Sequence, residues 1–268
     1  MSMRRTRLSL DAPEIRVVER EATIQRRLWR GNAFSQVVAP VLYLLAMGVG
    51  LGGMISAAGR TVDGLSYLEF VAPGLMAATV LQNATGESMW PVLAGFKWMR
   101  YYEGMSASPM TPADVYRGNL LWIAIRFTVA STAFLVVATL FGAILSPWGV
   151  LAVPAAVLGA VALAAPLTAY VATQEDDHVF PLIMRFLTLP MFLFSATFFP
   201  LSQLPTWLQP VAWVLPLYHS VSLCRDATTG TLAAGGWFAV AGHLAVLGAY
   251  ITVGYRIGRR TFTRRLAA

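Results

Sequence analysis

The sequence predicts an all-α integral membrane protein with six transmembrane helices, and three observations lead to this class. Hydrophobic residues make up 57% of the 268 residues and charged residues only 12%, which is about half the charged share of a soluble domain. The apolar residues form uncharged runs of the roughly 20 residues that a membrane-spanning helix requires. The net charge of +7 comes from 19 arginines and one lysine, which gather at the chain ends and between the apolar runs. This placement favours orientation in a membrane over nucleic-acid binding.

The six spans are predicted near residues 33–53, 70–93, 120–145, 150–173, 179–199 and 236–255. A turn sequence, Ser146-Pro147-Trp148-Gly149, separates the third span from the fourth. Basic residues are frequent before the first span, after the second and in the tail, whereas the connections after the first, third and fifth spans hold only Arg60 and Arg225. Because positive charge marks the cytoplasmic side, both termini are expected in the cytoplasm, which requires an even number of spans.

The chain is expected to comprise a cytoplasmic N-terminus (1–32), a transmembrane domain (33–257) and a basic cytoplasmic tail (258–268). Residues 14–30 place apolar side chains at helical spacing among arginines, which predicts an amphipathic helix on the inner membrane surface. A charged helix in solvent is the alternative. The apolar positions are Ile15, Val18, Ala22 and Trp29.

The connection over residues 96–119 mixes aromatic, small and charged residues. This composition suits either a docking surface for a soluble partner or a passive connecting loop. Thr111-Pro112-Ala113-Asp114 predicts a helix start, with a capping hydroxyl, a proline at the first position and a carboxylate in the first turn. A helix over 112–145 would be about 51 Å long. Since this exceeds the roughly 30 Å membrane core, its first turns are expected to project into the cytoplasm.

Glu87 and Arg126 are the charged residues expected deepest in the membrane, each in the inner half of its span. Charges at such depth either pair or reach the headgroups. Both arrangements fit the sequence: a Glu87–Arg126 contact that joins the second and third spans, or two separate side chains that extend to the inner surface.

Chemistry-bearing residues are sparse elsewhere. The run Glu175-Asp176-Asp177-His178 is interpreted as a solvated inner loop, because adjacent residues in a short turn cannot all converge on one metal ion. The single cysteine, Cys224, is interpreted as a buried apolar residue. Lys97 lies outside any glycine-lysine pattern of a nucleotide triphosphate site. No catalytic residue, metal site or cofactor is therefore expected in this chain, and ATP, if it is used, is bound by another chain.

The outer segment, residues 200–225, is apolar but is interrupted by proline at positions 200, 205, 210 and 216. Proline inside a helix costs about 3 kcal/mol, and a seventh crossing would place the arginine-rich tail outside. The pattern predicts short helices that re-enter from the outer face, one opened by Leu204-Pro205 and one running from Pro216 to about Arg225. The candidate outer-gate residues are Pro200, Pro205, Trp207, Pro216, Tyr218 and His219.

Several stretches resemble the membrane subunit of ABC-2 type transporters, in the branch of the nodulation-factor exporter NodJ and the daunorubicin exporter DrrB. They are Tyr67-Leu68-Glu69-Phe70-Val71-Ala72-Pro73-Gly74-Leu75, Phe194-Ser195-Ala196-Thr197-Phe198-Phe199-Pro200-Leu201, Leu204-Pro205 and Pro216-Leu217-Tyr218-His219. The resemblance implies a bacterial inner-membrane exporter of amphiphilic molecules such as drugs, lipids or glycolipids. It also implies a second permease copy or paralogue as partner, and a separate ATPase subunit that binds ATP and Mg²⁺.

By this resemblance, a coupling segment (101–116) docks into the ATPase. Its candidate residues are Tyr101, Tyr102, Glu103, Met105, Pro109, Asp114 and Tyr116. Substrate would pass between two copies along the first, second and fifth spans. The candidate path residues are Gln82, Asn83, Phe192, Phe194 and Phe198, although the phenylalanines fit contact with lipid equally well. Two other functions remain open at this point, namely an ATP-independent secondary transporter or channel, and a membrane-embedded lipid-modifying enzyme that uses residues 175–178.

Overall fold

The computed structural model describes residues 12–59, 61–232 and 237–267, with the backbone alone at 28–37, 39, 49 and 56. Within these ranges the chain is helical almost throughout. It contains no strand there, only an isolated bridge between Val62 and Leu65. The described part therefore agrees with the predicted all-α class.

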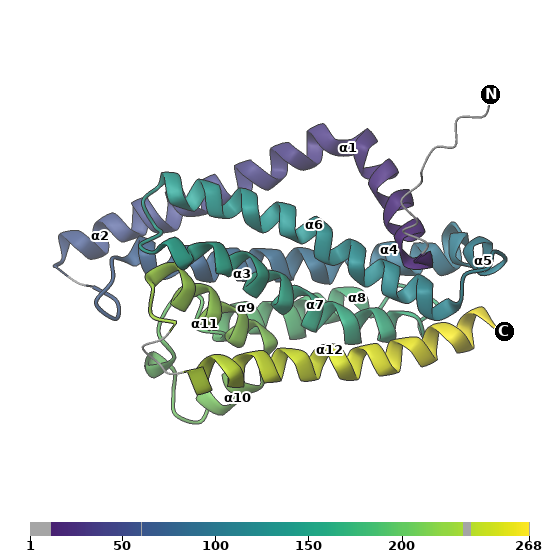
Figure 1. Cartoon of the computed structure of the whole chain (residues 1–268). Coiled ribbons are helices and arrows are strands. Elements are labelled where there is room, and N and C mark those ends of the chain that lie inside the picture. The colour runs from purple at the N-terminus through teal and green to yellow at the C-terminus, as the bar shows by residue number, and fades with distance from the viewer. Residues whose placement is uncertain (1–11, 60, 233–236, 268) are drawn as a thin grey trace.

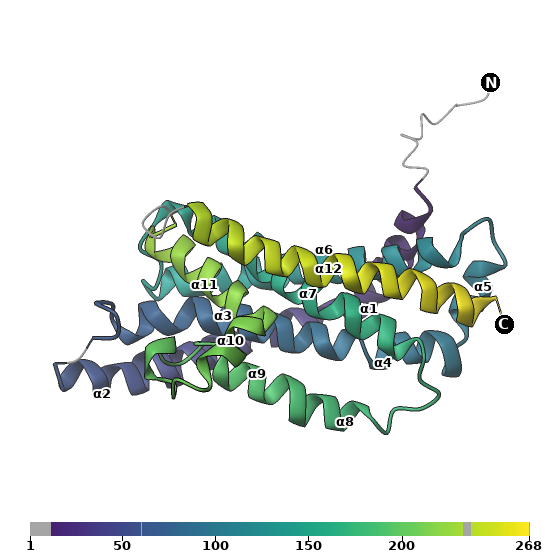
Figure 2. The ribbon, with the colours of Figure 1, turned by 90° about the horizontal axis from the view of Figure 1, so that it is seen from below.

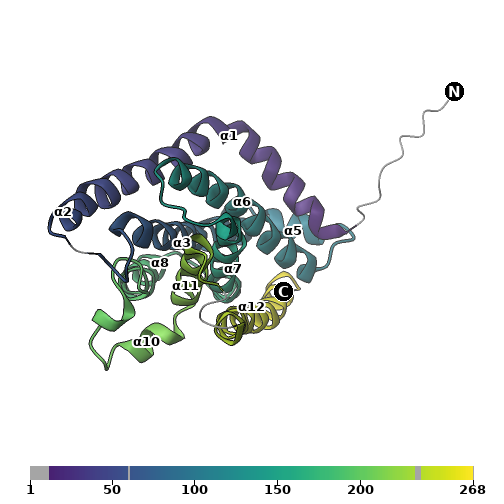
Figure 3. The ribbon, with the colours of Figure 1, turned by 60° about the vertical axis from the view of Figure 1, so that its left-hand side comes forward.

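The long helices run lengthwise through the molecule (Figure 1). They are α1 (Pro13–Tyr43), α3 (Tyr67–Glu87), α6 (Pro112–Leu140), α7 (Ala152–Val171) and α12 (Trp237–Leu266). Helix α7 is the central one and packs against α3, α6, α11 (Pro216–Thr229) and α12 (Figure 3). Its buried face is made largely of alanine, and such small side chains let neighbouring helices approach closely.

Three helices in the described ranges are long and apolar enough to cross a membrane, namely Pro112–Leu140, Pro147–Val171 and Trp237–Leu266. Shorter apolar helical runs cover Pro40–Ile55 and Phe180–Phe194. The predicted second span coincides largely with α3, which carries a carboxylate at each end, Glu69 and Glu87. Helical structure thus covers most of each stretch predicted to be a span.

The first predicted boundary differs from the structure. The amphipathic helix (14–30) and the first span (33–53) are joined in one helix, α1, which changes direction along its length (Figures 1 and 3) and continues into the π-helical run η1 (Leu44–Leu51) and α2 (Gly52–Ala57). No proline or glycine pair interrupts the chain between the two predicted parts, so the backbone hydrogen bonds continue. The side chain of Trp29 lies outside the described residues.

Helix α6 begins as predicted and ends earlier than predicted. The Thr111 hydroxyl accepts a hydrogen bond from the Asp114 amide and the Asp114 carboxylate accepts one from the Thr111 amide, which is a reciprocal capping box. The helix ends at Leu140 rather than 145, and Gly142 follows with φ of +74°. Glycine adopts this left-handed conformation at little cost. Twenty-nine residues correspond to about 43 Å.

Short helices fill the remaining connections. Helix α4 (Trp90–Leu93), the π-helical run η2 (Ala94–Trp98) and α5 (Tyr101–Ser106) lead from α3 to α6, and the 3₁₀ turn η3 (Pro147–Leu151) separates α6 from α7 as the turn sequence predicted. The fifth predicted span consists of α8 (Phe180–Ile183), the π-helical run η4 (Met184–Thr188) and α9 (Leu189–Phe194), and α8 and α9 lie at one edge of the molecule (Figure 2).

The outer segment contains η5 (Leu201–Gln203), α10 (Gln209–Val214) and the first part of α11. The second predicted helix opens at Pro216, but it runs to Thr229 rather than Arg225 and ends at Gly230, whose φ is +80°. The first predicted helix is wrong in position. Pro205 opens a turn in which its carbonyl accepts a hydrogen bond from the Leu208 amide, and the helix starts only at Gln209. Pro210, in the first turn of α10, is the proline that suits a helix start.

Candidate functional site

A carboxylate and a guanidinium meet between α3 and α6. The Arg126 Nη1 atom lies 2.6 Å from the Glu87 Oε1 atom, and both side chains are about a quarter exposed. Of the two arrangements that the sequence left open, the structure contains the contact. The pair lies at the last residue of α3 and in the middle of α6, so it joins these two helices.

Further charged groups lie close to this pair on α1. The pKa of Glu21 is raised above its ordinary value, because the effect of burial exceeds the opposing effect of the neighbouring Arg20. The charges of Glu87 and Arg126 contribute to the same shift. The Arg20 guanidinium carbon lies 3.5 Å from the ring centroid of Tyr101, the first residue of α5. The Tyr101 hydroxyl in turn donates a hydrogen bond to the Pro91 carbonyl. Helix α1 is thus connected to the start of the coupling segment.

The coupling segment is partly a core element. Tyr102, Asp114 and Tyr116 are buried within this chain, so their side chains position the segment rather than offer a docking surface. The Tyr102 hydroxyl accepts a hydrogen bond from the Asn119 amide group. The pKa of Asp114 lies below its ordinary value. Burial alone would raise it, but the hydrogen bonds from Thr111 and the ion pair with Arg117 lower it by more. Asp114 is therefore an ionised carboxylate near neutral pH.

Tyr116 joins three long helices at one point. Its hydroxyl lies 2.9 Å from the Ala165 carbonyl of α7 and 3.0 Å from the Gly254 carbonyl of α12, and it donates its proton to these oxygens. The tyrosine ring lies directly over Gly258, where an added Cβ atom would come within 2.2 Å of a ring carbon. Only glycine allows α12 to approach α6 this closely.

The exposed residues of the coupling segment lie on α5 and the turn after it. Glu103 and Pro109 are exposed, and Met105 and Tyr101 are half-buried. Arg100, which precedes α5, pairs with Glu103 at 2.9 Å. Helix α5 lies at the same end of the molecule as the C-terminal end of α12, far from α2 and α10 (Figure 1). A soluble partner that docks at this end would therefore meet α5.

The outer segment is attached to α3 by Arg225, a residue that the sequence analysis did not select. The Arg225 guanidinium donates hydrogen bonds to the Phe70 carbonyl at 3.2 Å and to the Ala196 carbonyl at 2.8 Å, and it stacks on the Phe70 ring. Ala196 has φ of +56°, an unusual value for a residue with a side chain. A basic residue in an otherwise uncharged segment was the available signal.

Among the candidate outer-gate residues, His219 has the most defined contacts. It is buried, its Nδ1 atom lies 2.7 Å from His243 Nδ1 of α12, and its Nε2 atom lies 2.7 Å from the Trp213 carbonyl. Tyr218 packs edge-on against both histidine rings. The other candidates do not converge on one place: Pro200 and Pro216 are buried, whereas Pro205 and Trp207 are exposed.

The candidate path residues are also distributed over separate contacts. Phe192 and Phe198 pack edge-on with ring centroids 5.0 Å apart, and Phe194 is half-buried. Gln82 is half-buried, and the exposed Asn83 donates a hydrogen bond to the Thr79 carbonyl of its own helix. An apolar recess of about 350 Å³ lies between α7, the fifth predicted span, the start of α11 and α12, and the candidate path residues do not line it. Its lining includes Leu167, Tyr170, Leu187, Met191, Pro216 and Tyr250.

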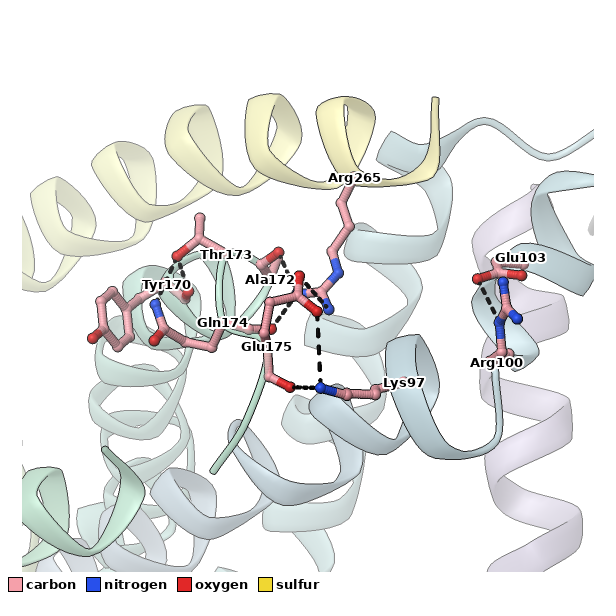
Figure 4. A network of polar contacts seen from close by, with 9 residues as sticks. All are labelled: Lys97, Arg100, Glu103, Tyr170, Ala172, Thr173, Gln174, Glu175 and Arg265. Carbon is pink, nitrogen blue, oxygen red and sulfur yellow. Dashed lines mark hydrogen bonds and ion pairs between the residues drawn. The ribbon is translucent and has the colours of Figure 1, made fainter. Parts of the chain in front are cut away.

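Glu175, the first residue of the acidic run after α7, lies against basic residues (Figure 4). Arg265 of α12 lies 3.4 Å from the Glu175 carboxylate, and Lys97 Nζ donates a hydrogen bond to the Glu175 carbonyl. Among the described residues, no group of three histidine, cysteine, aspartate or glutamate side chains is arranged to hold a metal ion. The enzyme alternative proposed for residues 175–178 therefore gains no support from the geometry.

The comparison with family models decides the class. The model described as ABC-2 type transporter matches residues 15–228. The chain belongs to this family. It is accordingly an integral membrane protein and the permease subunit of an ABC transporter, a transport component rather than an enzyme.

Named relatives agree with this assignment. Nodulation protein J of Rhizobium leguminosarum bv. viciae is 31% identical over 242 residues, which cover 89% of this permease and 90% of the relative. Nodulation protein J of Rhizobium meliloti is 29% identical over 89% of both chains. The inner membrane transport permease YadH of Escherichia coli is 25% identical and covers 76% of this permease and 78% of its own length. No solved structure matches the permease.

Proposed function

We propose that this permease moves an amphiphilic molecule, such as a drug, lipid or glycolipid, out of the cytoplasm or the inner leaflet. The energy comes from ATP that is hydrolysed with Mg²⁺ on a separate ATPase subunit. The proposal rests mainly on how the coupling segment is attached to the long helices in a chain of this family. Its buried tyrosines are fixed to α6, α7 and α12, and its α5 carries an exposed charged surface.

In this proposal the chain crosses the bacterial inner membrane six times, with residues 1–32 and 258–268 in the cytoplasm and the outer segment re-entering from outside. The distribution of arginine supports this topology. The arrangement of the helices agrees with it, because α5 and the C-terminal end of α12 lie at one end of the molecule, and α2 and α10 lie at the other (Figure 1).

The substrate class is inferred from an apolar recess and from the exposed apolar side chains of the fifth span. The recess of about 350 Å³ beside the fifth span is lined almost wholly by apolar side chains, with the tyrosines at 170 and 250 as its polar groups. This size and composition fall within the range of small-molecule sites. The exposed apolar residues of the fifth span include Leu182, Phe186, Leu189 and Leu193, and they fit a second permease copy or paralogue across the path.

ATP-driven closure of the ATPase can bias the permease only through contacts that differ between its two states. The coupling segment can supply such contacts because it includes the start of α6, where Tyr116 bonds to α7 and α12. A turn at residues 107–111 joins α5 to α6, and the Tyr102 hydroxyl of α5 accepts a hydrogen bond from Asn119 of α6. We therefore expect a displacement of α5 to reach α6, α7 and α12.

The experiment is co-purification of the tagged permease with an ATPase subunit expressed with it. Wild-type permease is expected to retain the ATPase and to raise its rate of ATP hydrolysis. Glu103→Arg reverses a charge on the exposed surface of α5 and is expected to reduce the retained ATPase about tenfold, that is, by about 1.4 kcal/mol of binding free energy. Gln203→Arg, on the exposed surface of the outer segment, is the matched control.

Equal retention by the two variants would contradict docking at α5, and a wild-type permease that transports without any ATPase would contradict the proposed energy source. Mass spectrometry of molecules bound to the purified complex tests the substrate class. An amphiphile released on ATP addition is the expected result, and a small hydrophilic solute in its place would refute the class.

A further inference from the structure

The cytoplasmic end of α12 lies against the coupling segment. Helix α12 continues to Leu266, beyond the span predicted at 236–255 and beyond the residues matched by the family model. Phe262, near its end, is completely buried. Its ring centroid lies 4.9 Å from that of Phe96, 5.0 Å from Tyr116 and 5.8 Å from Tyr102. The stretch predicted to be a basic tail is therefore partly a core element.

Arg265, one turn further along α12, fastens this end to α7. Its guanidinium donates hydrogen bonds to the Ala172 carbonyl at 2.9 Å and to the Gln174 carbonyl, and its side chain is only 17% exposed. Ala172 is the C-cap of α7 and Gln174 lies just beyond it, at the helix end where the dipole favours a positive charge. The same guanidinium lies 4.6 Å from the Phe96 ring centroid. Arg265 thus contacts the end of α7 and the start of the coupling connection together.

Lys97 completes the arrangement from the other side. Its ammonium group donates a hydrogen bond to the Glu175 carbonyl and lies 4.0 Å from the Glu175 carboxylate (Figure 4). The Glu175 side chain is 77% exposed, so its ion pairs are screened by water and contribute little. The less exposed Arg265, with its backbone acceptors, is the stronger connection of the two.

We infer that the end of α12, held by Phe262 and Arg265, belongs to the coupling unit and moves with α5 as one body. This inference rests on the proposed coupling to an ATPase. Arg265 is a positioning residue in this scheme: it holds the end of α12 to the end of α7 and to Phe96, while Phe262 of the same helix packs against Tyr102 of α5. Densely packed groups that meet in one arrangement transmit a shift because they cannot deform continuously.

Distances between spin labels on exposed residues test the inference. One label is attached at Ala107, at the end of α5, and the other at Thr263 of α12, each after substitution by cysteine. The native Cys224 is buried and is not expected to react with the label. The pair is measured in the permease–ATPase complex in lipid nanodiscs, without nucleotide and with ATP, Mg²⁺ and vanadate. We expect the same distance distribution in both states, whereas a pair from Ala107 to Gln203 of the outer segment changes.

Variants separate Arg265 from its neighbours. Arg265→Ala is expected to broaden the 107–263 distribution and to make its mean depend on nucleotide, and Arg265→Lys is expected to restore only part of the wild-type behaviour. Arg264→Ala is the matched control, because Arg264 has the same charge and is exposed. Thermal unfolding of each variant identifies a loss of fold, and Arg265→Lys, which keeps the charge, then serves as the milder change at the same contact.

A 107–263 distance that changes with nucleotide in the wild-type complex would overturn the inference, and so would an Arg265→Ala variant that behaves as wild type in both states. Failure of the proposed function has a different signature: no ATPase is retained by the wild-type permease. In that case the nucleotide-free comparison of Arg265→Ala with Arg264→Ala in the permease alone still decides whether Arg265 fixes the position of the end of α12 relative to α5.

Discussion

At the residue scale, the Glu87–Arg126 pair illustrates how an ion pair depends on its surroundings. Ion pairs exposed to water contribute about 0–1 kcal/mol, whereas breaking a buried pair costs about 3–5 kcal/mol because one charge is left without a partner. Both side chains here are about a quarter exposed, so an intermediate value is expected. The pair joins α3 and α6, the two helices that flank the coupling connection.

Removing either charge is expected to destabilise the permease by about 1–3 kcal/mol. Glu87→Gln and Arg126→Gln each leave one charge unpaired, so the double variant should be less destabilised than the sum of the two. Reversible unfolding in mixed micelles measures this coupling, and the exchange Glu87→Arg with Arg126→Glu should recover much of the loss. Strictly additive effects would show that the pair contributes nothing. Arg100→Gln, at an exposed pair, is the control and should change little.

Residue-scale contacts could be predicted from the sequence only where the partners are neighbours or the charges are rare. The two members of the capping box, Thr111 and Asp114, lie within four residues of each other, and Glu87 and Arg126 are rare charges within their predicted spans. From the sequence, Phe262 and Arg265 were assigned to a basic tail, because the residues that they contact are far away in the chain. The four-residue spacing of Gly254, Gly258 and Phe262 on one face of α12 was the signal that could have revealed the packing.

At the element scale, the contact between α6 and α12 depends on the absence of a side chain at Gly258. A Cβ atom there would lie 2.2 Å from the ring of Tyr116, whereas one at Gly242 of the same helix would meet no atom within 4 Å. Close packing leaves no room for the added methyl group, so the helices have to separate or Tyr116 has to change rotamer.

Gly258→Ala is therefore expected to destabilise the permease by about 1–3 kcal/mol. Gly242→Ala on α12 should be neutral or should stabilise by up to about 1 kcal/mol, because alanine is the better helix former. The thermal unfolding midpoints of the two variants in the same detergent measure the difference. If both variants shift the midpoint in the same direction by the same amount, the close approach at Tyr116 is not a determinant of stability.

Element boundaries could be predicted where local chemistry determines them. Pro216 and the capping sequence before Pro112 open their helices as expected, because a proline and a hydroxyl suit those positions irrespective of the fold. The early end of α6 and the late start of α10 depend on Gly142 and on competition between neighbouring prolines at 205 and 210. The continuity of α1 could not be inferred from hydropathy. Hydropathy distinguishes a part that lies on the membrane surface from a part that spans it, whereas the helical backbone of α1 continues through both parts.

At the scale of the whole molecule, the proposed topology places α5 and the end of α12 in the cytoplasm and the outer segment outside. Single cysteines at exposed positions test it. With a membrane-impermeant maleimide on intact spheroplasts, Ser202→Cys is expected to react, whereas Ser108→Cys and Ala267→Cys should react only after permeabilisation. Labelling of position 267 from outside would contradict the cytoplasmic position of the C-terminal tail. The native Cys224 is buried and gives the background signal.

The six crossings remain a prediction from hydropathy and arginine placement, since three helices in the described ranges are long and apolar enough to span a membrane. The packing order around α7 and the joining of α12 to the coupling segment depend on side chains far apart in the chain. No local pattern encodes them, and the structure is needed to find them.

Arg225 has a consequence for how this permease tolerates sequence change. Its hydrogen-bond acceptors at Phe70 and Ala196 are main-chain oxygens, which every amino acid carries, so these bonds set no requirement on the side chain at position 196. Burial and a φ of +56° restrict that position instead, to small residues or to those that accept a left-handed backbone, such as glycine. Lysine at 225 cannot supply the planar fork that reaches two oxygens together. Variants should therefore be uniform at 225, and a change there should weaken the attachment of α11 to α3.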